Sequence, residues 1–225
     1  MLKFAVIVAG GSGQRMGTTL PKQFLLLKNK PVLWHTLTAF LAAFNDLSII
    51  LVLPAEFIET GNDIVATVSD PSRIQITTGG DTRYQSVKNG LKLVDEKSIV
   101  FVHDGVRCLV SVALIKRCYD AALEKGNAVP ATAAIDSIRI ATGSSNTVID
   151  RNSVRIIQTP QTFLAAQLLK AFDQPFDPSF TDEATVVEKT GISIHLIEGE
   201  TSNIKITSPV DLLVAEKIMD ANVNL

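Results

Sequence analysis

A group of glycines and cations near the start of the chain could bind a phosphate chain. The apolar run 4–9 breaks into Gly10, Gly11, Gly13, Arg15 and Lys22. An apolar run of this length is typical of a parallel strand buried on both faces. Glycines after such a strand let backbone N–H groups approach a ligand where a Cβ would clash, and the two cations suit a polyphosphate. We therefore hypothesise that a nucleoside triphosphate binds where this strand ends.

This loop differs from two other phosphate-binding motifs. A P-loop requires Gly-x-x-x-x-Gly-Lys-Ser/Thr, but Lys22 here follows Pro21. The dinucleotide fingerprint requires Gly-x-Gly-x-x-Gly, but Met16 stands where the last glycine should be. The remaining alternative is a glycine-rich turn that binds nothing. Arg15 and Lys22 argue against that alternative.

The composition predicts an ordinary globular protein of the cytoplasm. The chain has 225 residues, of which 46% are hydrophobic, and a net charge of −2. This charge argues against a broad nucleic-acid surface, so anion binding should be local. Cys108 and Cys118 form no Cys-x-x-Cys pair and no metal-ligand spacing, which suits a reducing compartment. No apolar stretch approaches about 20 residues, so we expect no membrane span.

Strands and helices are predicted to alternate through the first 132 residues. Apolar runs predict strands at 4–9, 48–53, 74–77, 98–102 and 128–132. Apolar stripes predict helices at 32–44, 84–94 and 112–125. This alternation predicts a three-layer α/β fold, with a mostly parallel sheet and helices on both faces. Ligands bind such sheets at the carboxyl ends of strands, where the polar clusters 10–15, 79–83 and 103–107 fall.

The pattern changes in the second half of the chain. Weak alternation at 137–141 and 147–150 predicts a hairpin, which makes 134–154 a projecting arm within one domain of residues 1–225. A helix is predicted at 162–172, and Asp182 is predicted to cap another. Strands are predicted at 193–197 and 203–207, before a last helix capped by Ser208. Lys205 would lie within an apolar strand, where an unpaired lysine is costly, so a functional role is favoured.

Seven short motifs follow one another along nearly the whole chain. They are Gly10-Gly-Ser-Gly-Gln-Arg-Met16, Pro21-Lys-Gln-Phe24, Gly79-Gly-Asp-Thr-Arg-Tyr-Gln-Ser-Val87, His103-Asp104, Asp150-Arg-Asn152, Gln158-Thr-Pro-Gln161 and Asn203-Ile-Lys-Ile-Thr207. In this order they resemble the 2-C-methyl-D-erythritol 4-phosphate cytidylyltransferase family of the non-mevalonate isoprenoid pathway. The resemblance implies a Rossmann-like nucleotidyltransferase fold with a protruding β-hairpin arm.

The resemblance also implies a reaction. CMP would pass from CTP to 2-C-methyl-D-erythritol 4-phosphate, giving 4-diphosphocytidyl-2-C-methyl-D-erythritol and pyrophosphate, by in-line attack of the acceptor phosphate on the α-phosphorus. Mg²⁺ would be bound mainly through the triphosphate, with Asp104 as a protein ligand. Arg15 and Lys22 match residues that stabilise the transition state, and Arg151 and Lys205 match residues that position the acceptor. Such a transfer needs mostly positioning and charge stabilisation, which these cations can supply.

The binding residues implied by the resemblance form two sets. CTP would contact Ala9, Gly10, Gly11, Gly13, Arg15, Lys22, Gly80, Asp81, Ser86 and Gly105. The acceptor would contact Asp104, Arg107, Ser137, Arg151, Thr159 and Lys205. The family is a homodimer in which the arm crosses over, so Arg151 would serve the other subunit's site. The expected partners are thus CTP, a sugar-alcohol phosphate and a second copy, with no nucleic acid and no membrane.

Departures from the family pattern leave alternatives open. The chain has Gly10 where the family usually has alanine, Gly105-Val-Arg-Cys108 where it has Ala-Ala-Arg-Pro, and Ser137 where threonine is common. Ala-Gly-Gly also occurs in the ribitol-5-phosphate cytidylyltransferases, whereas Asp150-Arg-Asn152 favours the methylerythritol group. The alternatives are transfer to ribitol 5-phosphate, transfer of a purine or uridine nucleotide, and a nucleotide or sugar-phosphate sensor without catalysis.

Overall fold

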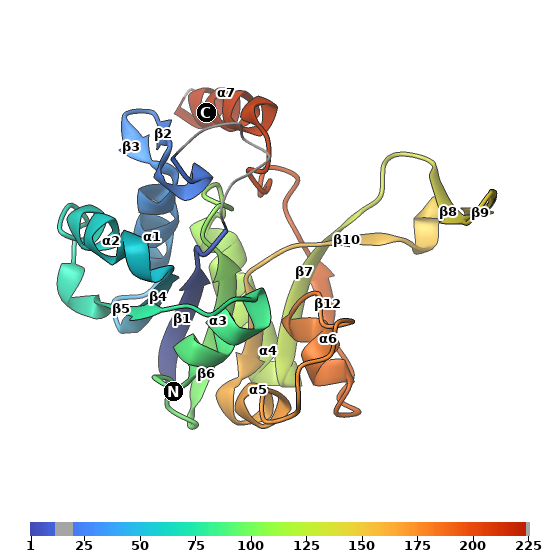
Figure 1. Cartoon of the computed structure of the whole chain (residues 1–225), viewed down its shortest axis with the longest axis horizontal. Helices are drawn as coiled ribbons and strands as arrows, with labels where there is room; N and C mark the ends of the chain where they lie inside the picture. Colours follow the sequence, from blue (N-terminus) through green and yellow to red (C-terminus); the bar gives the residue numbers. More distant parts are fainter. Residues whose placement is uncertain (12–19, 224–225) are drawn as a thin grey trace.

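A mixed β-sheet forms the centre of the molecule (Figure 1). The computed structural model describes residues 1–11 and 20–223, so the predicted site residues Gly13 and Arg15 lie outside the described residues. Within the described residues, the sheet has eight strands, which run β10-β7-β11-β6-β1-β4-β5, with β12 paired to β7. They are β1 (Leu2–Val8), β4 (Leu47–Leu53), β5 (Ile74–Thr78), β6 (Ser98–Asp104), β7 (Asn127–Ala133), β10 (Arg155–Ile157), β11 (Gln161–Leu164) and β12 (Leu196–Glu198).

The half of the sheet that carries the predicted ligand-binding edge is parallel. Strand β1 pairs in parallel with β4 and β6, and β4 pairs in parallel with β5. Strand β12 also runs parallel to β7, whereas β11 and β10 are antiparallel to their neighbours. The carboxyl ends of β1, β4, β5 and β6 therefore meet at one edge, as the sequence predicts for a mostly parallel sheet.

Helices cover both faces of the sheet, which gives the predicted three layers (Figure 1). The helices are α1 (Val32–Ala43), α2 (Ile58–Val65), α3 (Arg83–Leu91), α4 (Val112–Lys125), α5 (Ala165–Ala171), α6 (Glu183–Glu188) and α7 (Pro209–Val223). Alternate strand residues divide between two cores, because successive side chains of a strand point to opposite faces. Ala5 and Ile7 pack with α1, α2 and α4, whereas Val6 packs with α3, α5 and α6. In the described part of the chain, no helix is long and apolar enough to cross a bilayer.

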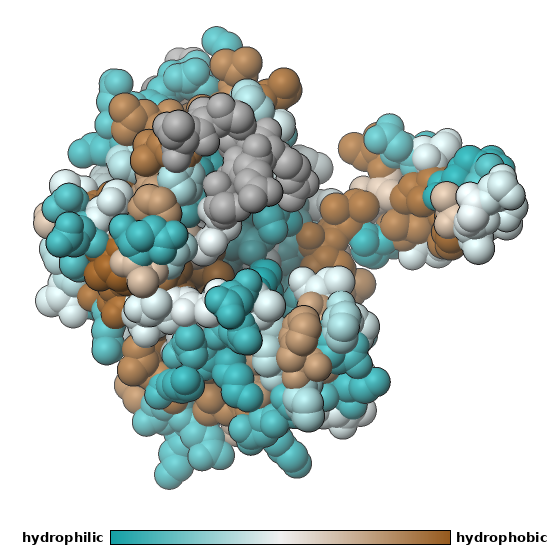
Figure 2. Space-filling view, viewed as in Figure 1, coloured by the Kyte–Doolittle hydropathy of each residue, from teal (hydrophilic) through white to brown (hydrophobic). Residues whose placement is uncertain are grey.

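A hairpin stands away from the body of the molecule (Figure 2). Its strands, β8 (Ile138–Thr142) and β9 (Ser145–Ile149), pair with each other in a sheet of their own, close to the predicted positions. Gly143 provides the left-handed turn residue, with a φ of 61°. Apolar side chains along the arm and its base are exposed, among them Ile135, Ile140 and Val148. A second short hairpin, β2 (Leu26–Leu27) with β3 (Lys30–Pro31), leads into α1.

Two predicted elements are wrong. The helix at 162–172 begins only at Ala165, because residues 161–164 form strand β11, which inserts between β6 and β7. The strand at 203–207 does not form, so Lys205 does not lie within a strand. Ile206 is fully buried beside Val106, and its N–H donates to the Val106 carbonyl at 3.1 Å, but no further ladder follows.

Helix termini follow the predictions only in part. Asp182 caps α6 as predicted, because its carboxylate accepts from the Thr185 N–H at 2.9 Å in a capping box. Before α7, Ser208 directly precedes the helix as predicted, and the Asp211 side chain in the first turn reaches back to it. The Asp211 carboxylate accepts from the N–H groups of Thr207 at 2.8 Å and Ser208 at 2.7 Å. The predicted strand 193–197 is shortened and shifted to Leu196–Glu198.

Candidate active site

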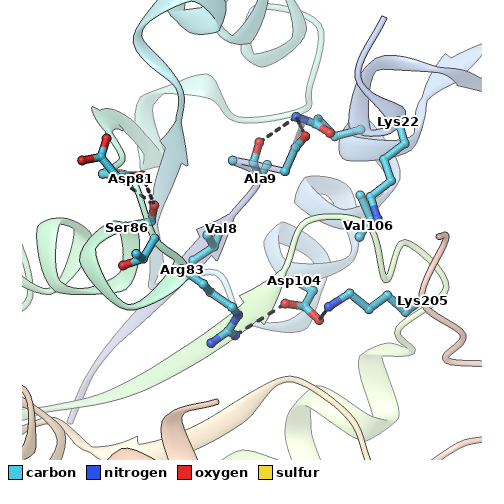
Figure 3. Close-up of a pocket in the computed structure, with 14 residues that line it drawn as sticks. Val8, Ala9, Lys22, Asp81, Arg83, Ser86, Asp104, Val106 and Lys205 are labelled. Atoms are coloured by element: carbon cyan, nitrogen blue, oxygen red, sulfur yellow. Dashed lines mark hydrogen bonds and ion pairs between the residues drawn. The ribbon is translucent and has the colours of Figure 1, made fainter. Parts of the chain in front are cut away.

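A cavity of about 360 Å³ lies at the edge where the parallel strands end (Figure 3). Residues from five segments line it: the end of β1 and the residues after it, residues 22–23 before α1, the start of α3, the end of β6 and the turn after it, and the segment before α7. The lining residues are Val8, Ala9, Gly10, Gly11, Lys22, Gln23, Gly80, Asp81, Thr82, Arg83, Ser86, Asp104, Val106 and Lys205. Nine of the predicted site residues are thus brought together, although they are spread over almost 200 positions.

The residues after β1 form one wall of the cavity. The Ala9 N–H donates to the Val52 carbonyl at 3.0 Å, which continues the sheet past the end of β1. The Gln23 amide donates to the carbonyls of Ala9 at 2.8 Å and Gly11 at 3.3 Å. Gln23 lies in the 3-10 turn Lys22–Phe24, so the same turn that fixes the glycine backbone also brings Lys22 to the cavity.

The opposite wall is the turn from β5 into α3. The Ser86 hydroxyl accepts from the Gly80 N–H at 3.1 Å and lies 3.3 Å from the Gly80 carbonyl. A Cβ on Gly80 would lie 2.5 Å from the Gln85 Cβ, so only glycine fits this turn. A further cavity of about 590 Å³ opens behind this wall and is lined by Gly10, Gly11, Pro54, Phe57, Gly79 and Gly80, among others. Its lining is rich in glycine, with Glu56 and Asp81 as its charged side chains, and leaves backbone N–H and C=O groups to read a base.

Asp104 holds three cations at the end of β6. Its carboxylate lies 2.9 Å from the Lys205 ammonium, 3.4 Å from the Arg107 guanidinium and 3.5 Å from the Arg83 guanidinium. Burial alone would raise the pKa of Asp104, but the attraction of Arg83, Lys205 and Arg107 outweighs it and holds the pKa well below its ordinary range. Asp104 is therefore ionised whenever the protein is folded near neutral pH. The Lys205 side chain stays 41% exposed and can face a ligand.

Arg83 and Glu183 belong to this cluster, but no role was predicted for either of them. The Arg83 guanidinium lines the cavity and binds both carboxylate oxygens of Glu183, with the contact to Oε2 at 2.9 Å. Glu183 is only 1% exposed. Arg83 is part of the motif that begins at Gly79, and this membership could have marked it as a site residue. Glu183 could be recognised only as an acid in the first turn of a helix.

His103 and Thr159 form hydrogen bonds that hold the backbone at Asp104. The Asp104 N–H donates to the Thr159 hydroxyl at 3.1 Å, and that hydroxyl lies 2.9 Å from His103 Nδ1. His103 Nε2 lies 3.2 Å from the Arg107 carbonyl. Nε2 therefore carries the proton and donates to that carbonyl, while Nδ1 accepts from Thr159. His103 is fully buried and is structural, and Thr159, a predicted acceptor residue, contacts the Asp104 backbone instead of lining the cavity.

Other predicted site residues lie away from this cavity. Gly105 is buried behind the wall, where its carbonyl accepts from the Thr36 hydroxyl at 2.9 Å and a Cβ would lie 2.9 Å from the Ala9 Cβ. Ser137 and Arg151 lie on the arm and at its base, and the Arg151 guanidinium donates to the Ile135 carbonyl at 2.8 Å. The roles assigned to these residues stay predictions.

A separate cavity of about 590 Å³ lies between the body and the base of the arm. Its lining is mostly apolar and includes Ile135, Ile138 and Ile156, with Arg107 and Lys205 on the side of the body. Lys205 lines this cavity and the glycine-walled one. The two cavities therefore meet at the cation that is paired with Asp104.

The described residues do not form a metal cage. Among them, no three His, Cys, Asp or Glu side chains are grouped to hold a metal ion. Asp104, the predicted metal ligand, already faces three cations, which compete with a divalent ion for its oxygens. A nucleotide-bound Mg²⁺ would therefore take most of its ligands from phosphate oxygens and water.

A glycine-lined cleft for a nucleotide, bordered by cations at the carboxyl edge of a parallel sheet, defines the class of the protein as a nucleotidyltransferase. Comparison with known proteins narrows this class. The family model "2-C-methyl-D-erythritol 4-phosphate cytidylyltransferase" (IspD) matches residues 3–221. The chain belongs to this family of cytidylyltransferases.

Relatives and solved structures agree over nearly the full length. The Bacteroides fragilis 2-C-methyl-D-erythritol 4-phosphate cytidylyltransferase is 43% identical over 97% of this chain and 100% of the relative. The Syntrophus aciditrophicus enzyme of the same name is 37% identical over 96% of this chain and 94% of the relative. The crystal structure of 4-diphosphocytidyl-2C-methyl-D-erythritol synthase from Anaerococcus prevotii is 27% identical, covers 97% of this chain and 96% of its own, and superposes with a TM-score of 0.83. The crystal structure of the Francisella tularensis 2-C-methyl-D-erythritol 4-phosphate cytidylyltransferase is 29% identical, covers 96% of this chain and 99% of its own, and superposes with a TM-score of 0.80.

The buried histidine generates a prediction about stability and pH. Burial lowers the pKa of His103 to about 3, although the charge of Asp104 opposes this shift. Between that value and about pH 6.5, the unfolded chain binds a proton at His103 that the folded protein does not. The free energy of unfolding should therefore fall by up to about 1.4 kcal/mol per pH unit as the pH drops below 6.5.

Urea unfolding at several values between pH 5 and pH 8 measures this slope. His103→Gln should be less stable at every pH but should have the flatter slope, and His195→Gln is the control variant. Equal slopes in the wild type and His103→Gln would contradict a neutral buried imidazole.

Proposed function

We propose that this protein transfers CMP from CTP to 2-C-methyl-D-erythritol 4-phosphate, giving 4-diphosphocytidyl-2-C-methyl-D-erythritol and pyrophosphate. The observation that carries this proposal is the position of Lys205. Its ammonium forms an ion pair with Asp104, and its side chain lines both cavities. One cavity is walled by glycines and suits a nucleotide, and the other is wide enough for a small polar acceptor. A cation between them suits a reaction between two phosphate groups.

The nucleotide would occupy the glycine-walled cavity and the space behind it. Backbone groups of Gly10, Gly80 and the Ser86 turn would contact the base and ribose, because glycine residues leave the backbone accessible there. Lys22 would hold the triphosphate on the other side, together with Arg15. These two cations would stabilise the charge that develops on the α-phosphate and on the leaving pyrophosphate.

The acceptor would enter from the arm side and place its phosphate against Lys205. A phosphate monoester is ionised near neutral pH, so its oxygen can attack the α-phosphorus without a general base. Attack in line with the departing pyrophosphate forms one P–O bond and breaks another. The protein's contribution is to hold two anions together, and most of the rate would come from positioning and charge stabilisation.

Mg²⁺ is proposed as the metal partner of CTP. Its ligands would be mainly phosphate oxygens, because the described residues near the triphosphate do not provide a cage. When bound, the ion would neutralise part of the triphosphate charge. The buried free thiols of Cys108 and Cys118, whose pKa values burial raises to about 12, are consistent with a reducing compartment such as the cytoplasm.

A homodimer with exchanged arms is part of the proposal. Ser137 and Arg151 match acceptor-binding positions but lie on the arm side, outside the glycine-walled cavity of their own chain. The exposed Ile135, Ile140 and Val148 would be covered if a second copy packed against the arm. In such a dimer each site would combine the body of one chain with the arm of the other.

The first test of the acceptor is pyrophosphate release with CTP and Mg²⁺. Methylerythritol 4-phosphate should be used far better than ribitol 5-phosphate, and ATP, GTP and UTP should be poor donors. Preference for ribitol 5-phosphate would keep the reaction class and overturn the acceptor. No release with any pair of donor and acceptor would overturn the enzyme function.

Removal of the bridging cation should affect the chemical step. Lys205→Met should lower kcat/KM for the acceptor by about two orders of magnitude, because one charge-stabilising donor contributes about 3 kcal/mol to the transition state. Steady-state kinetics with each substrate varied measure this effect. Lys217→Met, on the exposed surface of α7, is the matched control. A Lys205→Met enzyme with wild-type kcat/KM would remove the residue from the mechanism.

Arm exchange predicts that two inactive variants restore each other. Arg151→Ala removes the arm's contribution and Lys205→Met removes the body's. In a mixed dimer, one site would combine the intact body of the first variant with the intact arm of the second. Random subunit exchange at equal concentrations makes about half of the dimers mixed, and each mixed dimer has one active site out of two. The mixture should therefore regain about a quarter of wild-type activity. No restoration, despite exchange measured by mass spectrometry, would contradict a shared site.

A further inference from the structure

Glu183 is a buried acid that the proposed chemistry leaves without a role. It is 1% exposed and lies 100 positions from Arg83 in the sequence, yet its two oxygens bind the two terminal nitrogens of the Arg83 guanidinium. A side-by-side pair of this kind fixes the orientation of the guanidinium as well as its charge. The only part of the pair that reaches the cavity is Arg83, whose side chain is 30% exposed.

The position of Glu183 is set by the sheet. Glu183 is the first residue of α6, which Asp182 caps. The buried Gln161 of β11 donates to the Asp182 carboxylate at 2.8 Å and accepts from the Ala184 N–H at 2.8 Å. These two bonds anchor the start of α6 to a central strand. Glu183 therefore faces Arg83 from a fixed place.

The contacts divide the Asp104 carboxylate between its cations. Arg83 uses one nitrogen to reach Asp104 Oδ1, at 3.5 Å, and this nitrogen also contacts Glu183 at 2.9 Å. Oδ2 of Asp104 is left to Lys205 at 2.9 Å and to Arg107 at 3.4 Å. Figure 3 shows Asp104 between Arg83 on one side and Lys205 on the other.

We infer that Glu183 is a positioning residue for the transfer reaction: by binding Arg83 on both nitrogens, it limits Arg83 to one long contact with Asp104 and leaves Asp104 to orient Lys205. This inference rests on the proposed function for the role of Lys205. Without the Glu183 charge, the nearest carboxylate for Arg83 is Asp104. Arg83 would then bind Asp104 through two nitrogens and displace the lysine, because the bidentate pair is the stronger one.

The test compares the wild type with Glu183→Gln, which keeps the size of the side chain and removes its charge. We expect kcat/KM for the acceptor to fall at least tenfold, since small displacements of a positioning group lower rates strongly. KM for CTP should change less than twofold, because Lys22 and the backbone of Gly10 and Gly11, which would hold the nucleotide, come from the opposite wall of the cavity. Glu188→Gln, at the exposed end of the same helix, is the matched control and should match the wild type.

A second arm of the test separates positioning from folding. In an Arg83→Ala background, Glu183→Gln should cause no further loss of kcat/KM and should raise the Tm, because it removes a buried charge without a partner. A crystal structure of Glu183→Gln should show both terminal nitrogens of Arg83 on Asp104. If Glu183→Gln itself fails to fold, Glu183→Asp, which keeps the charge but shortens the side chain and weakens its hold on both Arg83 nitrogens, should give the same fall in kcat/KM in weaker form.

The outcomes are distinguishable. A wild type that does not transfer CMP to either acceptor overturns the proposed function. An active wild type with an unchanged acceptor kcat/KM in Glu183→Gln overturns this inference alone. An equal further loss in the Arg83→Ala background would show that Glu183 does not act through Arg83, and would overturn it as well.

Discussion

The carboxylate of Asp104 is the interaction on which the candidate site depends. It lies at the last position of β6, 8% exposed, and faces Arg83, Arg107 and Lys205. Burying an acid is costly unless cations accompany it, and burying cations is equally costly without the acid. The three cations reach Asp104 from α3, from the turn after β6 and from the segment before α7. One carboxylate therefore holds three separate parts of the chain at the same edge of the sheet.

The fold provides the fixed position that this cluster needs. Strand β6 is buried along its whole length between β1 and β11, so the end of β6 cannot move without disturbing the sheet. The Thr159 hydroxyl and the His103 ring fix the backbone at Asp104 from below. Across the cavity, Gln23 holds the backbone that follows β1. The Asp104 cluster and the loop after β1 are thus attached to neighbouring parallel strands, β6 and β1, which fixes the distance between them before any ligand binds.

Much of this arrangement was predictable from the sequence, for physical reasons. Strands such as residues 98–102 are continuous apolar runs because both faces are covered, and polar residues follow them where ligands bind. Residues 161–164 misled the prediction, since Leu164 fits a helical stripe with Leu168 and Phe172, and only tertiary pairing with β6 and β7 makes residues 161–164 a strand. The Arg83–Glu183 pair could not be found, because no local pattern links residues 100 positions apart. Arg151 is the opposite case: its sequence motif is clear, but its own chain does not bring it to the cavity.

The charges of the cluster have a consequence for catalysis. Arg83, Arg107 and Lys205 face two acids, Asp104 and Glu183, so the cluster carries one net positive charge. Two anionic substrates must approach each other, and an uncompensated cation in a partly buried place attracts both. The acids reduce this attraction, yet they keep the cations in place before substrate arrives, so that little reorganisation remains for the transition state. The two acids thus lower the positive charge of the site but fix the geometry of its cations. In a transfer that depends on positioning, the fixed geometry contributes more to the rate than the lost charge would.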